Sequence, residues 1–507
     1  MRNNVRKSQT TGISATKNKV SALLVAGFMV FAGTIFAAQN VTAKSRRQAA
    51  TPQNYLVKLA EGQANFASAM AEFGNAKVQP LFNNWVEVTI TSQKDALQVL
   101  RQMREVEYAQ PNYAIKLIED YQIHDPIRRE AFIRSVQNNP NLVEVRAKDN
   151  PAIPAVPAQA AGNDPLEAKQ WGMIDIGAKE AWSITMGKPE TIVAVIDTGV
   201  DYTHEDLVAN IWRNAKEIPN NNIDDDQNGY VDDVIGWDFV SNDNKPYDLA
   251  ASMLAMVVSG GNPGHGTHCA GNVAAKGKNA IGISGVAPNV TIMPLRFISD
   301  KGSGTTADAI KAVKYAVDNG ARILSNSWGS EGEDPAEAEE NKALREVVQY
   351  AQDKGALFIA AAGNGHMGVG YDNDADPKPS YPSSYEHDNI ISVAAMDVNG
   401  NLGAFSNWGP KSVDIGAPGV AVFSTVVQSQ KYSDTVIDFM GIKATWDGTS
   451  MACPHVAGAA ALYWSAHPEK TWQEVKQAIL SSAAPTESLK GKVTSGGRLN
   501  IKSLMRQ

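Results

Sequence analysis

Residues 192–199 read IVAVIDTG, and this stretch decides the fold class. Five consecutive apolar residues without a polar residue between them are typical of a strand in a parallel sheet that is buried on both faces. The run ends at Asp197, and a Thr-Gly turn follows. In α/β sheets of this kind, functional sites lie at the carboxyl ends of the strands. Asp197 is therefore a candidate functional residue.

Two further motifs place reactive side chains at the start of apolar helical stretches. Residues 264–271 (GHGTHCAG) carry His265, and residues 448–455 (GTSMACPH) carry Ser450. A serine hydroxyl becomes a nucleophile when a base takes its proton, and histidine titrates near neutral pH. A buried carboxylate holds the imidazole in the required tautomer. Together, Asp197, His265 and Ser450 predict nucleophilic catalysis.

Neighbouring residues would position the nucleophile and stabilise charge. Pro454 lacks an N–H group and is best tolerated in a first helical turn, so it predicts that Ser450 lies at a helix N-terminus. Residues 360–365 (AAAGNG) follow an apolar run and present Asn364. The side-chain amide of Asn364 and the backbone N–H of Ser450 are candidate donors to the oxyanion of a tetrahedral intermediate.

Composition limits the classes of partner. The chain has 507 residues, of which 43% are hydrophobic and 20% charged, as in globular proteins. Its net charge of -8 argues against nucleic-acid binding, which usually needs a basic face. The two cysteines, Cys269 and Cys453, are expected to be small buried residues behind the reactive side chains. Whether they form a disulfide stays open at this point.

The chain divides into four segments. Residues 1–43 combine a basic start, an apolar run and a small-residue exit, which is the pattern of a signal peptide. A secreted, extracellular product is expected, with the periplasm or cell envelope as further locations. The apolar run is long enough to leave a signal anchor as the alternative, but no stable membrane association is expected. Residues 54–117 mix strand-like and helix-like patterns and predict a small α+β module.

The remaining two segments differ sharply in character. Residues 118–162 are first charged and then rich in Pro and Ala, so they predict an exposed linker that can be cleaved. Residues 163–507 alternate apolar strand-like runs with helical stretches and predict one α/β domain.

The three motifs, in the order Asp…His…Ser, resemble those of the subtilisin-like serine proteases, the subtilase family or peptidase family S8. The resemblance covers residues 163–507. It implies a three-layer α/β sandwich with a central parallel sheet and an endopeptidase that cleaves polypeptides through an acyl-enzyme. Residues 54–117 resemble the ferredoxin-like propeptide of subtilases, an intramolecular inhibitor. The resemblance thus implies a monomeric, autoprocessed zymogen with its maturation site in residues 118–162.

The resemblance also assigns substrate-binding positions. Two segments would hold an extended peptide between them, and a third would lie beside the pocket for the residue that precedes the cleaved bond. The assigned residues are Gly302, Ser303 and Gly304 in the first segment, Ser327, Trp328 and Gly329 in the second, and Ser380 in the third.

Two calcium sites are expected. Residues 222–233 contain the D-x-D-x-N-G start of a calcium loop, although Ile235 stands where a bidentate Glu is usual, and Asp233 is a candidate substitute. The expected ligands there are Asp224, Asp226, Asn228 and Asp232. The second site follows from a resemblance to thermitase-like subtilases, which implies the ligands Asp164, Asp206 and Asn279.

Other functions fit less well. An esterase of the α/β-hydrolase type would show G-x-S-x-G and a different order of triad residues. A zinc protease would show HExxH, which the sequence lacks. An inactive binding protein on the same scaffold is the third alternative, although every motif position is intact. Because Cys269 follows His265 by one helical turn, we also expect a mercurial bound there to disturb the histidine.

Overall fold

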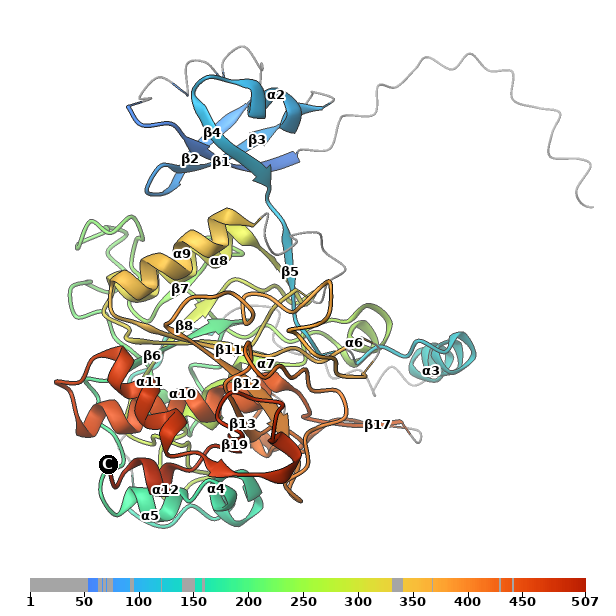
Figure 1. Cartoon of the computed structure of the whole chain (residues 1–507), viewed down its shortest axis with the longest axis vertical. Coiled ribbons are helices and arrows are strands. Elements are labelled where there is room, and N and C mark those ends of the chain that lie inside the picture. Colours follow the sequence, from blue (N-terminus) through green and yellow to red (C-terminus); the bar gives the residue numbers. More distant parts are fainter. Residues whose placement is uncertain are drawn as a thin grey trace, which may run out of the picture. The chain divides into compact units, whose positions relative to one another are not determined.

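Strand β6 (Ile192–Asp197) lies inside a large sheet in the computed structural model of the chain (Figure 1). The structure describes residues 53–62, 66, 70, 76–91, 95–119, 121–138, 151–156, 160–330, 341–366, 368–427, 430–439 and 442–507. The segment predicted to be a signal peptide, residues 1–43, is outside these ranges.

Within the described ranges the sheet has nine strands. In spatial order they are β18 (Ala484–Pro485), β19 (Gly497–Arg498), β13 (Ile415–Pro418), β12 (Ile390–Met396), β11 (Leu357–Ala361), β10 (Ile323–Asn326), β6, β8 (Thr291–Arg296) and β7 (Trp237–Asp238). Neighbouring strands are parallel except for β18 and β19, which are antiparallel.

Helices pack on both faces of this sheet, and alternate strand residues enter two separate cores (Figure 1). Val193 and Val195 belong to the core beneath α7 (His265–Ala274) and α10 (Thr449–Ala466). Ala194 and Ile196 belong to the core beneath α8 (Thr306–Asp318) and α9 (Lys342–Asp353). The uninterrupted apolar run of β6 is explained because both of its faces are covered. The predicted three-layer sandwich is confirmed.

Shorter elements complete the domain. The helices are α4 (Trp171–Asp175), α5 (Ala178–Trp182), α6 (Met253–Ser259), α11 (Trp472–Ser481) and α12 (Ile501–Leu504). The paired strands outside the main sheet are β14 (Ser424–Thr425) with β15 (Tyr432–Ser433), and β16 (Thr435–Phe439) with β17 (Ile442–Thr445). Among the described helices, none is both long enough and apolar enough to cross a bilayer.

The N-terminal module is a four-stranded antiparallel sheet with its own core. Its elements are β2 (Lys77–Phe82), β3 (Trp85–Ile90), β1 (Gln53–Leu59), β4 (Val106–Pro111) and α2 (Ala96–Gln102). An α+β module was expected here, and these elements agree with it. Residues 63–65, 67–69 and 71–75 of the module lie outside the described residues, so the ferredoxin-like arrangement stays a prediction.

Polar contacts join this module to α8 and α9. Glu346 of α9 accepts hydrogen bonds from Lys58 Nζ and Trp85 Nε1, both at 2.9 Å. Gln110, which is fully buried, donates to Asn341 Oδ1 at 2.8 Å. The Ala307 N–H in the first turn of α8 donates to Asn112 Oδ1 at 2.9 Å, so the module supplies a helix cap to the large α/β domain.

Strand β5 (Ala114–Lys116), at the end of the expected module, pairs with β9 (Ser303–Thr305) of the large α/β domain. The residues that follow β5 differ from the exposed linker that was expected. Helix α3 (Pro126–Asn138) follows, and its residues Phe132 and Val136 are buried in the core that also contains α7 and α10. Three apolar side chains of this stretch, Ile118, Phe132 and Val136, are therefore buried, whereas most other residues of α3 are exposed or partly exposed. Residues 151–156 of the Pro/Ala stretch form no helix or strand.

Candidate active site

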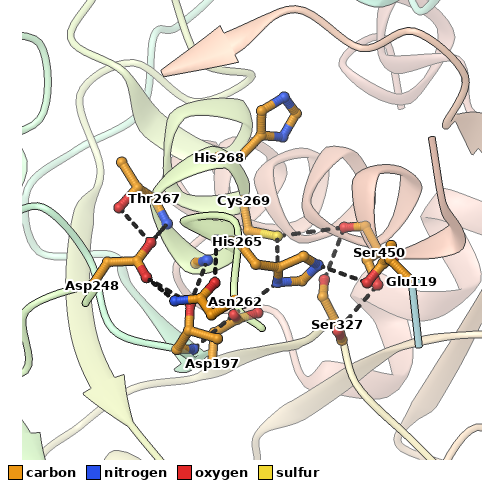
Figure 2. A network of polar contacts seen from close by, with 12 residues as sticks. Glu119, Asp197, Asp248, Asn262, His265, Thr267, His268, Cys269, Ser327 and Ser450 are labelled. Atoms are coloured by element: carbon orange, nitrogen blue, oxygen red, sulfur yellow. Dashed lines mark hydrogen bonds and ion pairs between the residues drawn. The ribbon is translucent and has the colours of Figure 1, made fainter. Parts of the chain in front are cut away.

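Asp197 and His265 meet between the end of β6 and the start of α7. His265 Nδ1 lies 2.8 Å from Asp197 Oδ1, and both side chains are almost completely buried (Figure 2). The close approach requires glycine at position 266, because a Cβ there would lie 2.1 Å from the carbonyl oxygen of Gly199. Asp197 also accepts the Thr198 N–H at 2.7 Å, which fixes the carboxylate. Packing and hydrogen bonds within the domain thus hold the pair in place.

A buried polar network behind this pair was not predicted from the sequence. Asp248 Oδ1 accepts hydrogen bonds from Thr198 Oγ1 and Asn262 Nδ2, and its Oδ2 accepts two from Thr267 (Figure 2). Asn262 Oδ1 in turn accepts the backbone N–H of His265 at 2.9 Å. Burial raises the pKa of Asp248, whereas the four donated hydrogen bonds favour its charged form. The network joins the end of β6 to the start of α7.

Ser450 is the second residue of α10, as its sequence context predicted. Pro454, however, lies in the second helical turn rather than the first. The proline has no N–H to donate to the Ser450 carbonyl, which instead accepts hydrogen bonds from Ser327 Oγ at 2.9 Å and Cys269 Sγ at 3.5 Å. Ser450 Oγ donates to the Ser327 carbonyl at 3.1 Å. Proline is tolerated there because other groups satisfy the carbonyl that it frees.

Asn364 follows β11 and faces the start of α10. Its Oδ1 accepts the backbone N–H of Thr449 at 2.8 Å and the Thr449 hydroxyl at 2.9 Å. These bonds identify Oδ1 as the acceptor and leave Nδ2 to donate into the site. Nδ2 lies 3.2 Å from the carbonyl oxygen of Ile118, two residues after β5. An amide held in this way is suited to donate to an oxyanion.

Glu119 occupies the site beside His265 and had no signal in the sequence. Its Oε2 lies 3.1 Å from His265 Nε2, and its Oε1 accepts a hydrogen bond from Asn364 Nδ2 at 3.2 Å (Figure 2). Burial opposes protonation of His265, but the carboxylates of Asp197 and Glu119 outweigh it and hold the pKa of His265 well above its usual value. The Glu119 carboxylate therefore covers His265 Nε2 and favours the charged form of the imidazole.

Several residues assigned to substrate binding contact residues 114–117. Gly302 accepts the Leu117 N–H at 3.0 Å through its carbonyl, and Ser303 and Gly304 belong to the strand that pairs with β5. Gly329 forms an antiparallel bridge with Lys116.

The other assigned residues are buried and support these segments. Trp328 is fully buried and packs edge-on against Phe297 at 5.0 Å. Ser327 bonds Ser450 through both its hydroxyl and its carbonyl. Ser380 is buried, and a Cβ placed on Gly363 would lie 2.9 Å from its Oγ.

Both cysteines are free thiols and are buried. Cys269 Sγ lies 3.9 Å from His265 Nδ1, and burial raises its pKa to about 11. Burial also raises the pKa of Cys453, to about 12. Asp197, His265 and Cys269 bring their ligand atoms within 4.8 Å of one another, a group that could hold a soft metal ion.

In the first expected calcium loop, the structure gathers a set of residues that differs from the predicted one. Glu217, Asp226 and Asp233 place carboxylate oxygens within 4.8 Å of one another, and Asn228 Nδ2 donates to Asp233 at 2.9 Å. Asp233 was the candidate substitute, and Glu217 was missed because it lies upstream of the motif. Glu217 Oε2 is buried and lacks a hydrogen-bond partner among the described residues, which suits an oxygen that faces a cation.

Two of the expected loop ligands are turned elsewhere. Asp224 accepts the N–H groups of Asn228 and Gly229. Asp232 accepts those of Asn221 and Asn222. These carboxylates shape the loop and do not join the group of three.

The second expected calcium set does come together from three distant segments. Asn279 Nδ2 donates to Asp206 Oδ1 at 2.8 Å, and the Asn279 N–H donates to Asp164 Oδ1 at 3.0 Å. All three side chains are buried. Burial, with the nearby charge of Asp164, raises the pKa of Asp206 to about 7. Buried acidic oxygens of this kind suit a hard cation.

Comparison with known proteins agrees with this geometry. The profile of the subtilase family (Peptidase_S8) matches residues 188–500. A thermophilic serine proteinase of Bacillus sp. (strain AK1) is 35% identical over 354 residues, 70% of each chain. Thermitase of Thermoactinomyces vulgaris is 36% identical over 301 residues, 59% of this chain and 84% of that protein.

A solved structure bears on the fold alone. The crystal structure of fervidolysin from Fervidobacterium pennivorans, a keratinolytic enzyme related to subtilisin, matches with a TM-score of 0.62 at 23% identity. The match covers 91% of this chain and 62% of that one. Fold and sequence matches together define a hydrolase of the serine protease class. More particularly, the chain belongs to the subtilase family.

The substitution Asp248→Asn is expected to lower the free energy of unfolding by about 2 kcal/mol. An amide cannot accept at both positions, so a buried donor of Asn262 or Thr267 loses its partner. Urea unfolding in a Ser450→Ala background, which removes the candidate nucleophile, measures the change. Asp300→Asn, at an exposed carboxylate, is the matched control. Equal stability of the two variants would contradict this role of Asp248.

A mercurial such as p-chloromercuribenzoate is expected to inhibit the active enzyme slowly. Reaction at Cys269 would place a metal beside His265, but the buried thiol with its raised pKa reacts sluggishly. Casein hydrolysis followed over time after addition of the reagent measures the effect. Cys269→Ala should be resistant, whereas the control Cys453→Ala should remain sensitive. Unchanged activity of the wild type would refute the idea.

Proposed function

We propose that this chain is an exported serine endopeptidase, made as an inactive precursor, in which Asp197, His265 and Ser450 cleave peptide bonds. One observation carries the proposal. A main-chain carbonyl, that of Ile118, lies 3.2 Å from the oriented Asn364 amide, in a site that also contains a buried Asp197–His265 pair. The arrangement has the parts that acyl transfer requires: a hydroxyl, a base, an orienting carboxylate and an oxyanion donor.

The proposed reaction begins when His265 Nε2 is neutral and free to accept a proton. Ser450 Oγ attacks the carbonyl carbon and passes its proton to Nε2, while Asp197 stabilises the imidazolium through Nδ1. Asn364 Nδ2 and the Ser450 N–H donate to the oxyanion. The C–N bond then breaks, and the leaving amine takes the proton from Nε2. Water hydrolyses the acyl-enzyme by the same proton transfers in reverse, which restores Ser450.

The N-terminal module is proposed to act as the enzyme's own inhibitor. Its sheet docks through Glu346 and Asn341, and the strand that leaves it, β5, fills the segments assigned to substrate. In this state the Glu119 carboxylate lies against His265 Nε2 and favours the charged imidazole, which makes His265 a poor base. The enzyme is proposed to be monomeric, to act on polypeptides and to have no nucleic-acid partner. Export is proposed on the signal-peptide pattern of residues 1–43.

Calcium is proposed as a structural ligand at two places. Glu217, Asp226 and Asp233 would hold one ion, and Asp164, Asp206 and Asn279 would hold another. Both sets offer the oxygen ligands that calcium prefers, and both tie together segments that are distant in sequence. The ions would supply charge compensation to buried carboxylates and thereby stability.

Substitution Ser450→Ala is expected to abolish casein hydrolysis and to leave the full precursor unprocessed after expression. Treatment of the active enzyme with PMSF should likewise abolish activity, since both changes remove the attacking hydroxyl. Ser183→Ala, at an exposed serine outside the site, is the processing control. Residual activity of Ser450→Ala equal to that of the wild type would exclude the serine mechanism. Activity on short esters without cleavage of casein would favour the esterase alternative.

Removal of calcium with EDTA is expected to lower the melting temperature of the Ser450→Ala protein. A ligand at a hundred times its Kd stabilises the folded state by about 2.7 kcal/mol, and EDTA removes that contribution. Glu217→Gln should shrink the EDTA-dependent shift, because it removes a proposed ligand, whereas Glu190→Gln at an exposed carboxylate should not. An identical melting temperature with and without EDTA would argue against structural calcium.

A further inference from the structure

The precursor segment passes through the active site as an added strand. Ile115 pairs with Gly304 and Lys116 with Ser303 on one side, while Lys116 bridges Gly329 on the other. One residue further along, the Leu117 N–H donates to the Gly302 carbonyl. Antiparallel pairing fixes the register of a strand, so each following residue has a defined place.

The register places one peptide bond against the catalytic groups. Ile118 follows Leu117, and its carbonyl is the one that accepts a hydrogen bond from Asn364 Nδ2. The next side chain, that of Glu119, lies against His265 Nε2, the atom that must exchange protons with the reacting groups (Figure 2). The bond between Ile118 and Glu119 is therefore flanked by the oxyanion donor on one side and the base on the other.

Burial of the side chains agrees with this register. Ile115 and Ile118 are each 4% exposed, whereas the Lys116 side chain between them is exposed. Ile115 lies in the same hydrophobic core as Trp328 and Leu344, where aromatic and aliphatic side chains enclose it. Two apolar anchors thus hold the segment, one three residues before Ile118 and the other at Ile118 itself.

We propose that the precursor cleaves itself between Ile118 and Glu119, once the Glu119 side chain has left His265. The inference rests on the proposed function. Ser450 Oγ bonds to the Ile118 carbonyl carbon as the C–N bond breaks, and its proton reaches the Glu119 nitrogen by way of His265 Nε2. Water then releases Ile118 as a carboxylate, and Glu119 becomes the new N-terminus.

The Glu119 side chain restrains this cut. It covers His265 Nε2 and accepts the hydrogen bond from Asn364 that an oxyanion would need. A carboxylate is suited to this because it pairs with the imidazolium and disfavours the neutral base. Cleavage must await the moments when the pair is broken, so the precursor persists long enough to fold.

Time-resolved N-terminal sequencing of the full-length chain tests the bond. Apart from the chain left by removal of the signal peptide, the earliest fragment that contains Ser450 is expected to begin at Glu119. A first fragment that begins elsewhere, for instance within residues 139–162, would overturn the inference. The Ser450→Ala chain separates this failure from that of the proposed function. If it is cut as fast as the wild type, self-processing fails; if it stays whole while the wild type is cut elsewhere, only the assigned bond fails.

A charge at the buried position tests the apolar anchor. Ile118→Asp is expected to slow the first cut at least tenfold, because an ionised side chain is disfavoured in an apolar pocket. Ile127→Asp places the same substitution on an isoleucine of α3 that is 81% exposed, and it should be cut at the wild-type rate. Melting curves of both variants in the Ser450→Ala background distinguish a folding defect from a cutting defect. Equal cutting rates in two folded proteins would overturn the assignment.

Removal of the Glu119 charge tests the restraint. Glu119→Gln is expected to speed the first cut severalfold, because the amide cannot hold His265 in its charged form. Glu130→Gln, at an exposed carboxylate of α3, is the matched control. Quantification of the remaining full-length chain over time measures both rates. A cut that is unchanged or slower in Glu119→Gln would show that the carboxylate does not restrain the reaction.

Discussion

The hydrogen bond between Asp197 and His265 joins two layers of the sandwich, and the geometry of the site depends on it. Asp197 ends a strand that is buried on both faces, and His265 begins a helix that covers one of them. Neither side chain can move without disturbing packed neighbours. The Asp248 network strengthens the same junction by tying the turn after β6 to the first residues of α7. Hydrogen bonds to Asp248 thus fix the turn after β6 against the first residues of α7.

Residues 114–119 contact the sheet edge and His265 of this site. Backbone pairing along β5 is independent of side-chain identity, so it can hold any extended peptide. Glu119 then adds a charge that suits a resting site and opposes a working one. In the proposed function, inhibition and substrate binding would therefore use the same surface, and the Glu119 carboxylate would distinguish them.

The positions of Asp197, His265 and Ser450 in the fold could be predicted from sequence because each residue lies in a short motif whose local structure is strongly determined. The apolar run predicted the strand β6, and the helix-start pattern predicted the place of Ser450 at the beginning of α10. Asp248 and Glu119 could not be found in this way, since their roles arise from contacts between residues far apart in the chain. The expected calcium loop, residues 222–233, contains residues that the motif identified and residues whose role depends on the fold. Its motif identified Asp226 and Asn228, but Glu217 joins them through the fold, and Asp224 turns to main-chain amides. The composition of residues 118–138 also concealed the few apolar side chains that anchor them.

Helix α3 has a kinetic consequence. Its residues Phe132 and Val136 are buried in the catalytic domain, and Tyr121 packs edge-on against Trp446 near His265. These residues stay covalently attached to the catalytic domain whatever happens at Ile118. A tethered ligand is present at an effective concentration that dilution cannot lower, typically in the millimolar range for short connections. A cut after Ile118 would therefore leave Tyr121, Phe132 and Val136 packed against the large domain after the N-terminal module has left.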